Sequence, residues 1–138
     1  MARTIIELSS LDETDRFGKT LAKELRPGDV LAFYGDIGAG KTTLIKSIVS
    51  SFSYPKSEIT SPTFTYLNIY NAKLPIFHFD LYRFENEEEF LQKGFDEYFE
   101  ANGICLVEWA EKIPSLLPKN TKKIFLKHKE GARACFVE

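Results

Sequence analysis

Apolar positions in the first half of the chain switch between strand-like runs and helix-like spacing. Thr4–Leu8 and Val30–Tyr34 are short apolar runs of the length expected for strands. Between them, Ser10 and Glu13 have capping-box spacing, which predicts the start of a helix that Pro27-Gly28 ends. Its apolar face consists of Phe17, Leu21, Ala22 and Leu25. A second helical face follows Lys41 and consists of Leu44, Ile45, Ile48, Val49 and Phe52.

The second half of the chain, beyond a loop expected over residues 53–62, is dominated by strand patterns. Asn86 is expected to cap a short helix that Gly94 ends, and a further helical turn follows over residues 95–99. Strands are predicted at residues 66–70, 76–79 and 104–109, and in a C-terminal hairpin of 122–129 and 132–137. The hairpin makes the predicted sheet mixed rather than wholly parallel.

The loop between the second strand and the second helix carries a phosphate-binding pattern. Residues 35–42 spell Gly-Asp-Ile-Gly-Ala-Gly-Lys-Thr, which matches G-x-x-x-x-G-K-[ST]. Glycines let backbone N–H groups surround the phosphates, Lys41 supplies a cation and Thr42 offers its hydroxyl to magnesium. A strand before the loop and a helix after it are the context that the motif requires. The pattern therefore predicts a nucleoside triphosphate site.

Two acidic residues follow apolar strands and could complete this site. Asp80 ends Ile-Phe-His-Phe-Asp, and Glu108 ends Ile-Cys-Leu-Val-Glu. A phosphate-binding loop needs an acidic partner that contacts magnesium or orients the attacking water. Spacing alone does not divide these roles between the two carboxylates.

Residues around these acids allow two interpretations each. Residues 60–63, Thr-Ser-Pro-Thr, form either a switch that reaches the magnesium or an ordinary hydroxyl-rich turn. Arg83 either stabilises transition-state charge or, as we favour, pairs with Glu85 or the acidic run at 87–89. Trp109 either packs in the core or at the rim of the site, or contacts a partner protein. We interpret His78 as a partly buried structural histidine.

Composition excludes several classes of function. The net charge of −2 gives no basic field for nucleic acid. Cys105 and Cys135 lie in apolar runs and are expected to be buried reduced thiols. The sequence has no C-x-x-C or H-E-x-x-H spacing, so a zinc site built by protein alone is not expected. No apolar run approaches a membrane span or a signal-peptide core, and we expect a cytoplasmic protein.

Four segments, in this order and spacing, resemble the TsaE (formerly YjeE) family, the small bacterial ATPases of tRNA threonylcarbamoyladenosine biosynthesis. They are residues 35–43, Ser-Pro-Thr-Phe at 61–64, His-Phe-Asp-Leu-Tyr-Arg at 78–83 and Val-Glu-Trp at 107–109. The resemblance extends from Asp12 to Arg133. It implies a single domain over residues 1–138, with an α/β, three-layer P-loop nucleoside triphosphate hydrolase fold. The central sheet is then mixed and mostly parallel, with a C-terminal antiparallel hairpin.

The resemblance also assigns roles position by position. Asp80 matches the catalytic acid near the terminal phosphate, and Thr42 and Glu108 match the ligands of Mg2+. Thr14 matches a nucleotide contact near the base, and Arg133 a late arginine near the nucleotide. The phosphates are assigned to Gly38, Ala39, Gly40, Lys41, Thr42 and Thr43. A switch or regulatory role is assigned to Ser61, Thr63, Tyr82, Arg83 and Trp109.

The resemblance implies that the chain binds and hydrolyses ATP, weakly alone and faster with partner proteins. Those partners are the TsaD–TsaB pair, which places threonylcarbamoyl on adenosine 37 of tRNAs reading codons that begin with adenine; tRNA is met only through this complex. One alternative is a small-molecule kinase, although residues 53–65 hold no arginine for a lid. Another is a nucleotide-gated binding module that does not hydrolyse ATP. The sequence has no Asn-Lys-x-Asp guanine reader, which agrees with adenine.

Overall fold

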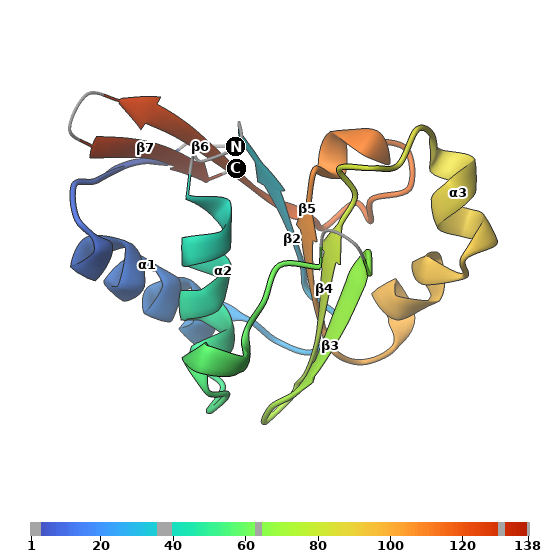
Figure 1. Ribbon diagram of the computed structural model, residues 1–138, viewed down its shortest axis with the longest axis horizontal. Coiled ribbons are helices and arrows are strands. Elements are labelled where there is room, and N and C mark those ends of the chain that lie inside the picture. Colours follow the sequence, from blue (N-terminus) through green and yellow to red (C-terminus); the bar gives the residue numbers. More distant parts are fainter. Residues whose placement is uncertain (1–3, 36–39, 63–64, 130–131, 138) are drawn as a thin grey trace.

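The computed structural model describes residues 4–35, 40–62, 65–129 and 132–137. These residues form a seven-stranded sheet with helices on both faces (Figure 1). The strands are β1 (Thr4–Leu8), β2 (Val30–Tyr34), β3 (Leu67–Asn71), β4 (Pro75–Asp80), β5 (Ile104–Glu108), β6 (Lys122–Lys129) and β7 (Ala132–Val137). The α-helices are α1 (Leu11–Glu24), α2 (Lys41–Ser50) and α3 (Glu87–Gln92), and the 3-10 helices are η1 (Lys56–Glu58), η2 (Phe95–Glu100) and η3 (Ala110–Lys112).

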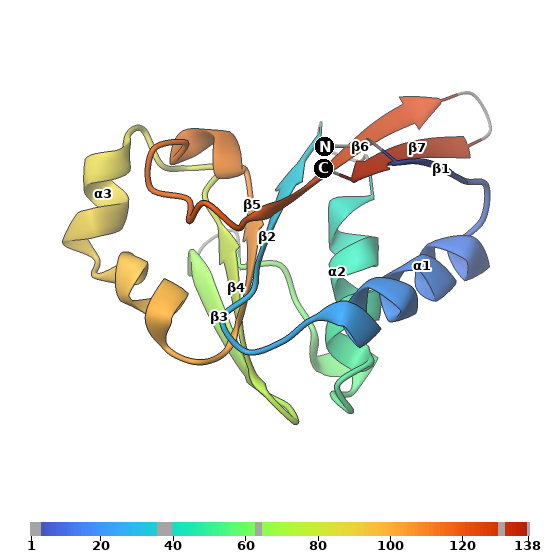
Figure 2. The same ribbon diagram turned by 180° about the vertical axis from the view of Figure 1, so that it is seen from behind.

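The strand order across the sheet is β1-β7-β6-β2-β5-β4-β3. The central strands β6, β2, β5 and β4 are parallel to one another, and the outer pairs β1–β7, β7–β6 and β4–β3 are antiparallel. Helices α1 and α2 cover one face, and α3 with η2 covers the other, as the view from behind also shows (Figure 2). The predicted three-layer α/β fold with a mixed sheet and a C-terminal hairpin is thus confirmed.

Side chains of β4 alternate between the two helical layers, as strand geometry requires. Ile76 packs in the apolar cluster that includes α1 and α2, whereas Phe77 and Phe79 pack in the cluster on the α3 side. His78 and Asp80 have the same parity as Ile76, so both point to the α2 side. Both are buried.

Strand β5 follows the same alternation. Ile104 and Leu106 pack on the α2 side, and Val107 packs on the α3 side. Glu108, the last residue of β5, therefore also faces the α2 side. In the parallel ladder Glu108 is the register partner of Asp80. The alternation and the register together bring two carboxylates to one face at one edge of the sheet.

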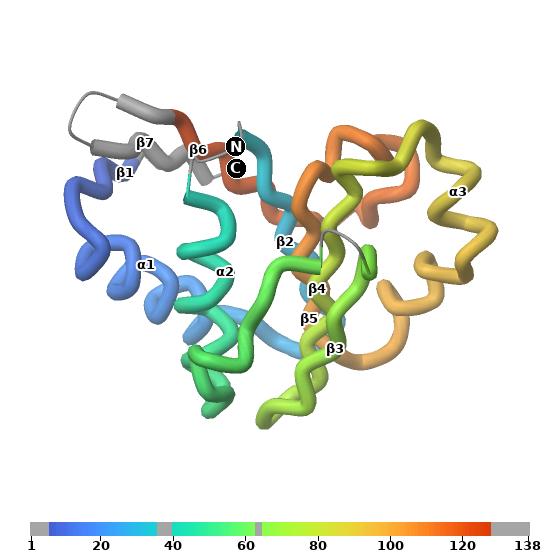
Figure 3. The backbone as a smooth tube through the Cα atoms, in the orientation of Figure 1, coloured from blue at the N-terminus to red at the C-terminus, as the bar shows by residue number. Residues whose placement is uncertain are grey.

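Helices α1 and α2 pack unusually close together at Gly18 and Ser47. A Cβ atom on Gly18 of α1 would lie 2.3 Å from Ser47 Oγ, so this contact requires glycine. The Ser47 hydroxyl donates a hydrogen bond to the Asp15 carbonyl at 2.7 Å. Hydrogen bonds from Lys56 and Lys19 hold the pKa of the Asp15 carboxyl far below its usual value. Figure 3 shows the two helices side by side along the chain path. The contact between α1 and α2 therefore fixes the position of the helix that begins at Lys41.

Most predicted elements agree with the structure, but two local details were wrong. Ser10 caps α1, with its hydroxyl accepting from Glu13 N at 3.1 Å. The Glu13 carboxylate does not complete a capping box, because it accepts from Ser9 N at 2.8 Å instead of from the cap residue. The strand predicted to reach Trp109 ends at Glu108, because Trp109 adopts a left-handed backbone with φ 59°.

The described cysteine is the buried thiol that the sequence predicted. Cys105 is free, and burial raises its pKa to about 12. The side chain of Cys135, in β7, lies outside the described residues. Within the described part of the chain, every helix is too short or too polar to cross a membrane.

Candidate functional site

The N-terminus of α2 is open to an anion. Gly40 is its N-cap with φ 100°, a conformation that favours glycine, and among the described residues no side chain caps the helix. The first turn, Lys41 to Thr43, contains no acidic residue. Free N–H groups and the positive end of the helix dipole make this position favourable for phosphate. Gly38 and Ala39, which were predicted to contribute further N–H groups, lie outside the described residues.

Lys41 is buried, with 6% of its surface exposed. Its Nζ donates a hydrogen bond to the Gly35 carbonyl and lies 3.8 Å from the centroid of the Trp109 ring. Trp109 in turn packs against Tyr82, with ring centroids 5.0 Å apart. Lys41, Tyr82 and Trp109, which sequence analysis assigned to one site, are therefore brought together.

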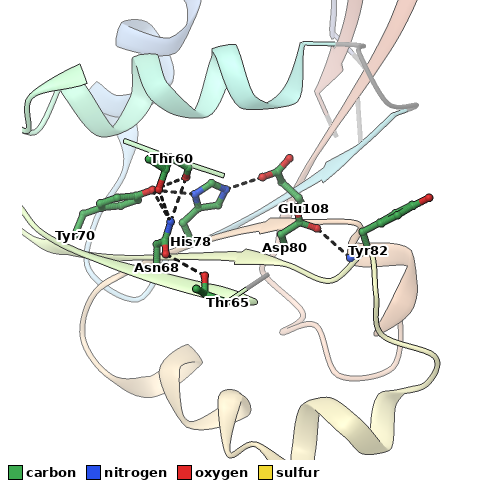
Figure 4. Close-up of polar contacts among 8 residues, drawn as sticks. All are labelled: Thr60, Thr65, Asn68, Tyr70, His78, Asp80, Tyr82 and Glu108. Atoms are coloured by element: carbon green, nitrogen blue, oxygen red, sulfur yellow. Dashed lines mark hydrogen bonds and ion pairs between the residues drawn. The ribbon is translucent and has the colours of Figure 1, made fainter. Parts of the chain in front are cut away.

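Asp80 and Glu108 lie side by side at the carboxyl ends of β4 and β5 (Figure 4). Their exposed fractions are 5% and 3%. Asp80 Oδ1 accepts a hydrogen bond from Tyr82 N at 3.0 Å. Ligands of open α/β sheets bind outside the carboxyl ends of parallel strands, which is where these two acids lie.

Glu108 is connected to a buried polar network that sequence analysis did not predict. Its Oε2 accepts a hydrogen bond from Nε2 of His78 at 2.6 Å. The other ring nitrogen, Nδ1, is hydrogen-bonded to the Tyr70 hydroxyl at 3.3 Å. That hydroxyl donates to the Thr60 carbonyl at 2.9 Å. Burial raises the pKa of Tyr70, so its proton stays in place. Figure 4 shows these side chains in a row beneath α2.

Asn68 connects the same network to residues 60–63, for which sequence analysis left open a switch or an ordinary turn. Its Nδ2 donates to the Thr60 carbonyl at 3.2 Å and to Thr60 Oγ1 at 3.1 Å. Its Oδ1 accepts from the Thr65 hydroxyl at 3.2 Å. Between these anchors Ser61 is exposed, and Thr63 lies outside the described residues. The structure thus places Thr60, the start of this segment, in hydrogen-bond contact with Tyr70, which is itself hydrogen-bonded to His78.

Comparisons with known proteins decide the family. Residues 8–135 match the family described as Threonylcarbamoyl adenosine biosynthesis protein TsaE. The chain belongs to the TsaE family. It is 44% identical to the tRNA threonylcarbamoyladenosine biosynthesis protein TsaE of Bacillus subtilis strain 168, over 84% of this chain and 72% of that protein. It is 40% identical to the protein of that name from Rickettsia prowazekii strain Madrid E, over 87% and 83% of the two chains.

A solved structure agrees with this assignment. The crystal structure of YdiB from Bacillus subtilis superposes with a TM-score of 0.80, at 34% sequence identity. The match covers 99% of this chain and 84% of the YdiB chain. The TsaE-family assignment rests on the family match and the relatives, and it confirms the resemblance found in the sequence motifs. The YdiB structure supports the fold.

The donors in this TsaE-family site suit magnesium that arrives with a nucleotide. Among the described residues, no group of three or more His, Cys, Asp or Glu side chains could hold a metal ion. Glu108 Oε1 is nevertheless a buried oxygen that accepts no hydrogen bond from the described part of the chain. Magnesium keeps several waters and binds through one or two protein oxygens plus phosphates. Glu108 with the Thr42 hydroxyl, at the second residue of α2, fits that requirement.

The remaining predicted residues lie in other parts of the TsaE-family fold. Thr14 is buried in α1, and its hydroxyl donates to the Ser10 carbonyl at 3.2 Å. Arg133 lies in β7 opposite Leu8 of β1, and its side chain is outside the described residues. Arg83 is exposed just after β4. The roles predicted for these residues stay predictions.

His78, Tyr70 and Asn68 are the residues whose part in the site sequence reasoning missed. His78 was interpreted as partly buried and structural, but none of its surface is exposed and it contacts Glu108. The alternation along β4 was a usable signal for His78, because it puts this residue on the same face as Asp80. No comparable signal existed for Tyr70 and Asn68, because the antiparallel register of β3 on β4 is not visible in the sequence.

Proposed function

We propose that this chain binds ATP with magnesium at the N-terminus of α2 and hydrolyses it in support of tRNA threonylcarbamoyladenosine formation. The main support for this proposal is the register pairing of Asp80 with Glu108, at the strand ends beside the helix that begins with Lys41. Carboxylates at this position, next to a phosphate-binding loop, are what triphosphate hydrolysis requires. Membership of the TsaE family supplies the biological setting.

Each residue has a distinct part in the proposed reaction. The α2 N–H groups and Lys41 bind the phosphates, and Lys41 exchanges its contact with the Gly35 carbonyl for phosphate oxygens. Asp80 orients the attacking water and accepts a hydrogen bond from it. Thr42 and Glu108 would hold magnesium, which would supply positive charge beside the phosphates. Trp109 covers Lys41 and limits the access of bulk water to the phosphates.

The proposed partners are the TsaD–TsaB pair, with tRNA met only through that complex. The net charge of −2 gives no general attraction for a polyanion. Tyr82, 47% exposed beside Trp109, gives the site an aromatic rim that a protein partner could cover. Covering this rim would exclude water from the site, so we expect the partners to accelerate a weak intrinsic hydrolysis. The modification is formed by the partners on adenosine 37 of tRNAs reading codons that begin with adenine.

The deciding measurement is the rate of phosphate release by the chain alone and with TsaD, TsaB and tRNA. We expect slow release alone and faster release with the complete set. Rapid turnover by the isolated chain that the partners leave unchanged would contradict the proposal. Phosphorylation of a small molecule in place of water would indicate a kinase, and mass spectrometry distinguishes the two products.

Two substitutions separate binding from hydrolysis. Lys41→Ala is expected to remove about 1.5–3 kcal/mol of ATP binding free energy, because a charged hydrogen-bond donor to phosphate is lost. Asp80→Asn should keep ATP affinity by calorimetry and lose partner-stimulated phosphate release. Asp96→Asn, an exposed change in η2 on the other side of the sheet, is the matched control. If Asp80→Asn released phosphate like the control, Asp80 would not be the catalytic acid. If the native chain with TsaD, TsaB and tRNA released no phosphate, the chain would be a binding module and not an ATPase.

A further inference from the structure

Glu108 uses only one of its carboxylate oxygens within the described protein. Oε2 accepts the 2.6 Å hydrogen bond from His78 Nε2, and Oε1 accepts none from the described residues. Only 3% of the Glu108 surface is exposed. A buried carboxylate with one free oxygen is costly unless a ligand meets that oxygen. The arrangement therefore presents Oε1 for coordination while His78 fixes the orientation of the carboxylate.

His78 has no freedom to reorient. None of its surface is exposed, and both ring nitrogens are hydrogen-bonded, Nε2 to Glu108 and Nδ1 to the Tyr70 hydroxyl. A carboxylate only accepts, so Nε2 donates in the shorter contact. The Tyr70 ring is itself buried and packs against Tyr54, with ring centroids 5.0 Å apart. The orientation of the imidazole is thus set from both sides.

We propose that His78 is a positioning residue that holds Glu108 in the orientation needed to coordinate nucleotide-bound magnesium, and that Tyr70 holds His78. The inference rests on the proposed function, since it assigns the same metal to Glu108. Residues that hydrogen-bond to metal ligands orient them, and their loss typically lowers metal affinity about 10–100-fold. Glu108 without His78 would regain side-chain rotations that the metal must then restrict.

The network also has a second end. Tyr70 donates to the Thr60 carbonyl, which Asn68 holds as well, and Ser61 follows directly. The orientation of the Glu108 carboxylate is thereby linked by three consecutive hydrogen bonds to Thr60, the first residue of the segment that is either a switch or an ordinary turn. A change in the position of Thr60 alters the support of His78 and, through it, the support of Glu108.

The test measures metal binding rather than turnover. Mn2+, which shares the preference of Mg2+ for carboxylate and water oxygens, is titrated into the ADP complex and followed by electron paramagnetic resonance. The variants are His78→Leu, which removes the donor, and His78→Gln, which keeps an N–H donor near the position of Nε2. Tyr70→Phe removes only the hydroxyl, and Glu108→Gln removes the ligand. ADP affinity with chelator present and thermal unfolding are measured for each variant.

We expect His78→Leu to weaken Mn2+ binding about 10–100-fold, with metal-free ADP affinity unchanged. His78→Gln should recover most of the loss, and Tyr70→Phe should show a smaller loss in the same direction. In the Glu108→Gln background, His78→Leu should add nothing, because the two residues act through one ligand. If His78→Leu does not fold, His78→Gln and Tyr70→Phe decide the question: native Mn2+ affinity in Tyr70→Phe would then overturn the proposal.

Two other outcomes distinguish the inference from the proposed function. Native Mn2+ affinity in folded His78→Leu, or an undiminished loss in the Glu108→Gln background, would overturn the positioning role and leave Glu108 as the ligand. Native Mn2+ affinity in Glu108→Gln itself would overturn both, because the metal would then bind elsewhere.

Discussion

The ammonium group of Lys41 lies over the indole ring of Trp109, 3.8 Å from the ring centroid. A desolvated contact of this kind contributes about 2 kcal/mol. The left-handed backbone of Trp109, with φ 59°, turns the ring toward the site directly after Glu108. Lys41 is therefore held by an aromatic face and a backbone carbonyl. Binding of a nucleotide has to compete with both contacts.

The first prediction uses Trp109 as a reporter, since the chain has a single tryptophan. Addition of ADP should change the tryptophan emission, because the ammonium group shifts from the indole toward the phosphates. The fluorescence titration should give the same dissociation constant as calorimetry. Lys46→Met, a change on the same helix, should keep the response, whereas Lys41→Met should lose it. Unchanged emission at calorimetric saturation would show that Lys41 keeps its contact with the ring.

The second prediction concerns the close approach of α1 and α2. Gly18→Ala should lower the free energy of unfolding by about 1–3 kcal/mol, because the added methyl overlaps Ser47. Urea denaturation measures the loss. The Gly18→Ala/Ser47→Gly double variant should lose less stability than the sum of the losses in the two single variants, because the Ser47 side chain that the new methyl overlaps is gone. If the two losses were strictly additive, α1 and α2 would move apart to accommodate the methyl without contact between the two positions.

The third prediction is a pH dependence of stability centred on Asp15. Its pKa is lowered in the folded state, chiefly by the hydrogen bond from Lys56, and its ordinary value is 3.8. The stabilisation is therefore fully present well above pH 3.8 and is lost as the pH falls below that value. Asp15→Asn should destabilise the protein at pH 7, and its difference from the native chain should be smaller, but still present, at pH 3, because the loss continues down to the lowered folded-state pKa. Urea unfolding at both pH values checks this, and an equal difference at both would contradict it.

The fourth prediction concerns the thiol of Cys105. Burial raises its pKa to about 12, so almost no thiolate exists at pH 8, and the side chain is also inaccessible. Iodoacetamide should modify this cysteine only at the rate of unfolding, and rapidly in denaturant. Peptide mapping by mass spectrometry separates it from Cys135. Fast modification of the native protein would indicate that β5 opens locally.

Local patterns were sufficient to predict the elements and part of the site. The residues flanking Lys41 indicated a strand and a helix, and the strand-end positions of Asp80 and Glu108 indicated the acids. Their neighbouring positions across the ladder depend on strand register, which the sequence does not encode locally. For the same reason the contacts of Tyr70 with His78 and Thr60 were missed.

The predictions of two local details were wrong for other reasons. Trp109 leaves the strand in a left-handed conformation, which a bulky residue rarely adopts, so no sequence signal predicts it. Ser9 and Ser10 both precede Glu13, and the carboxylate bonds to the first of them instead of closing the expected box. The cap was predictable, but the choice between two adjacent serines was not.

The register of the sheet has a consequence for how this protein unfolds. Phe33 of β2 and Asp80 of β4 are both partners of Glu108 of β5, so three strands meet at one level of the ladder. A slip of β4 by one residue would turn Asp80 and His78 away to the α3 side. If the chain binds a nucleotide as proposed, nucleotide affinity is a measure of correct strand pairing. By mass action, a nucleotide at 100 times its dissociation constant would add about 2.7 kcal/mol to the stability of this sheet. The cellular supply of nucleotide would then help to keep the central strands together.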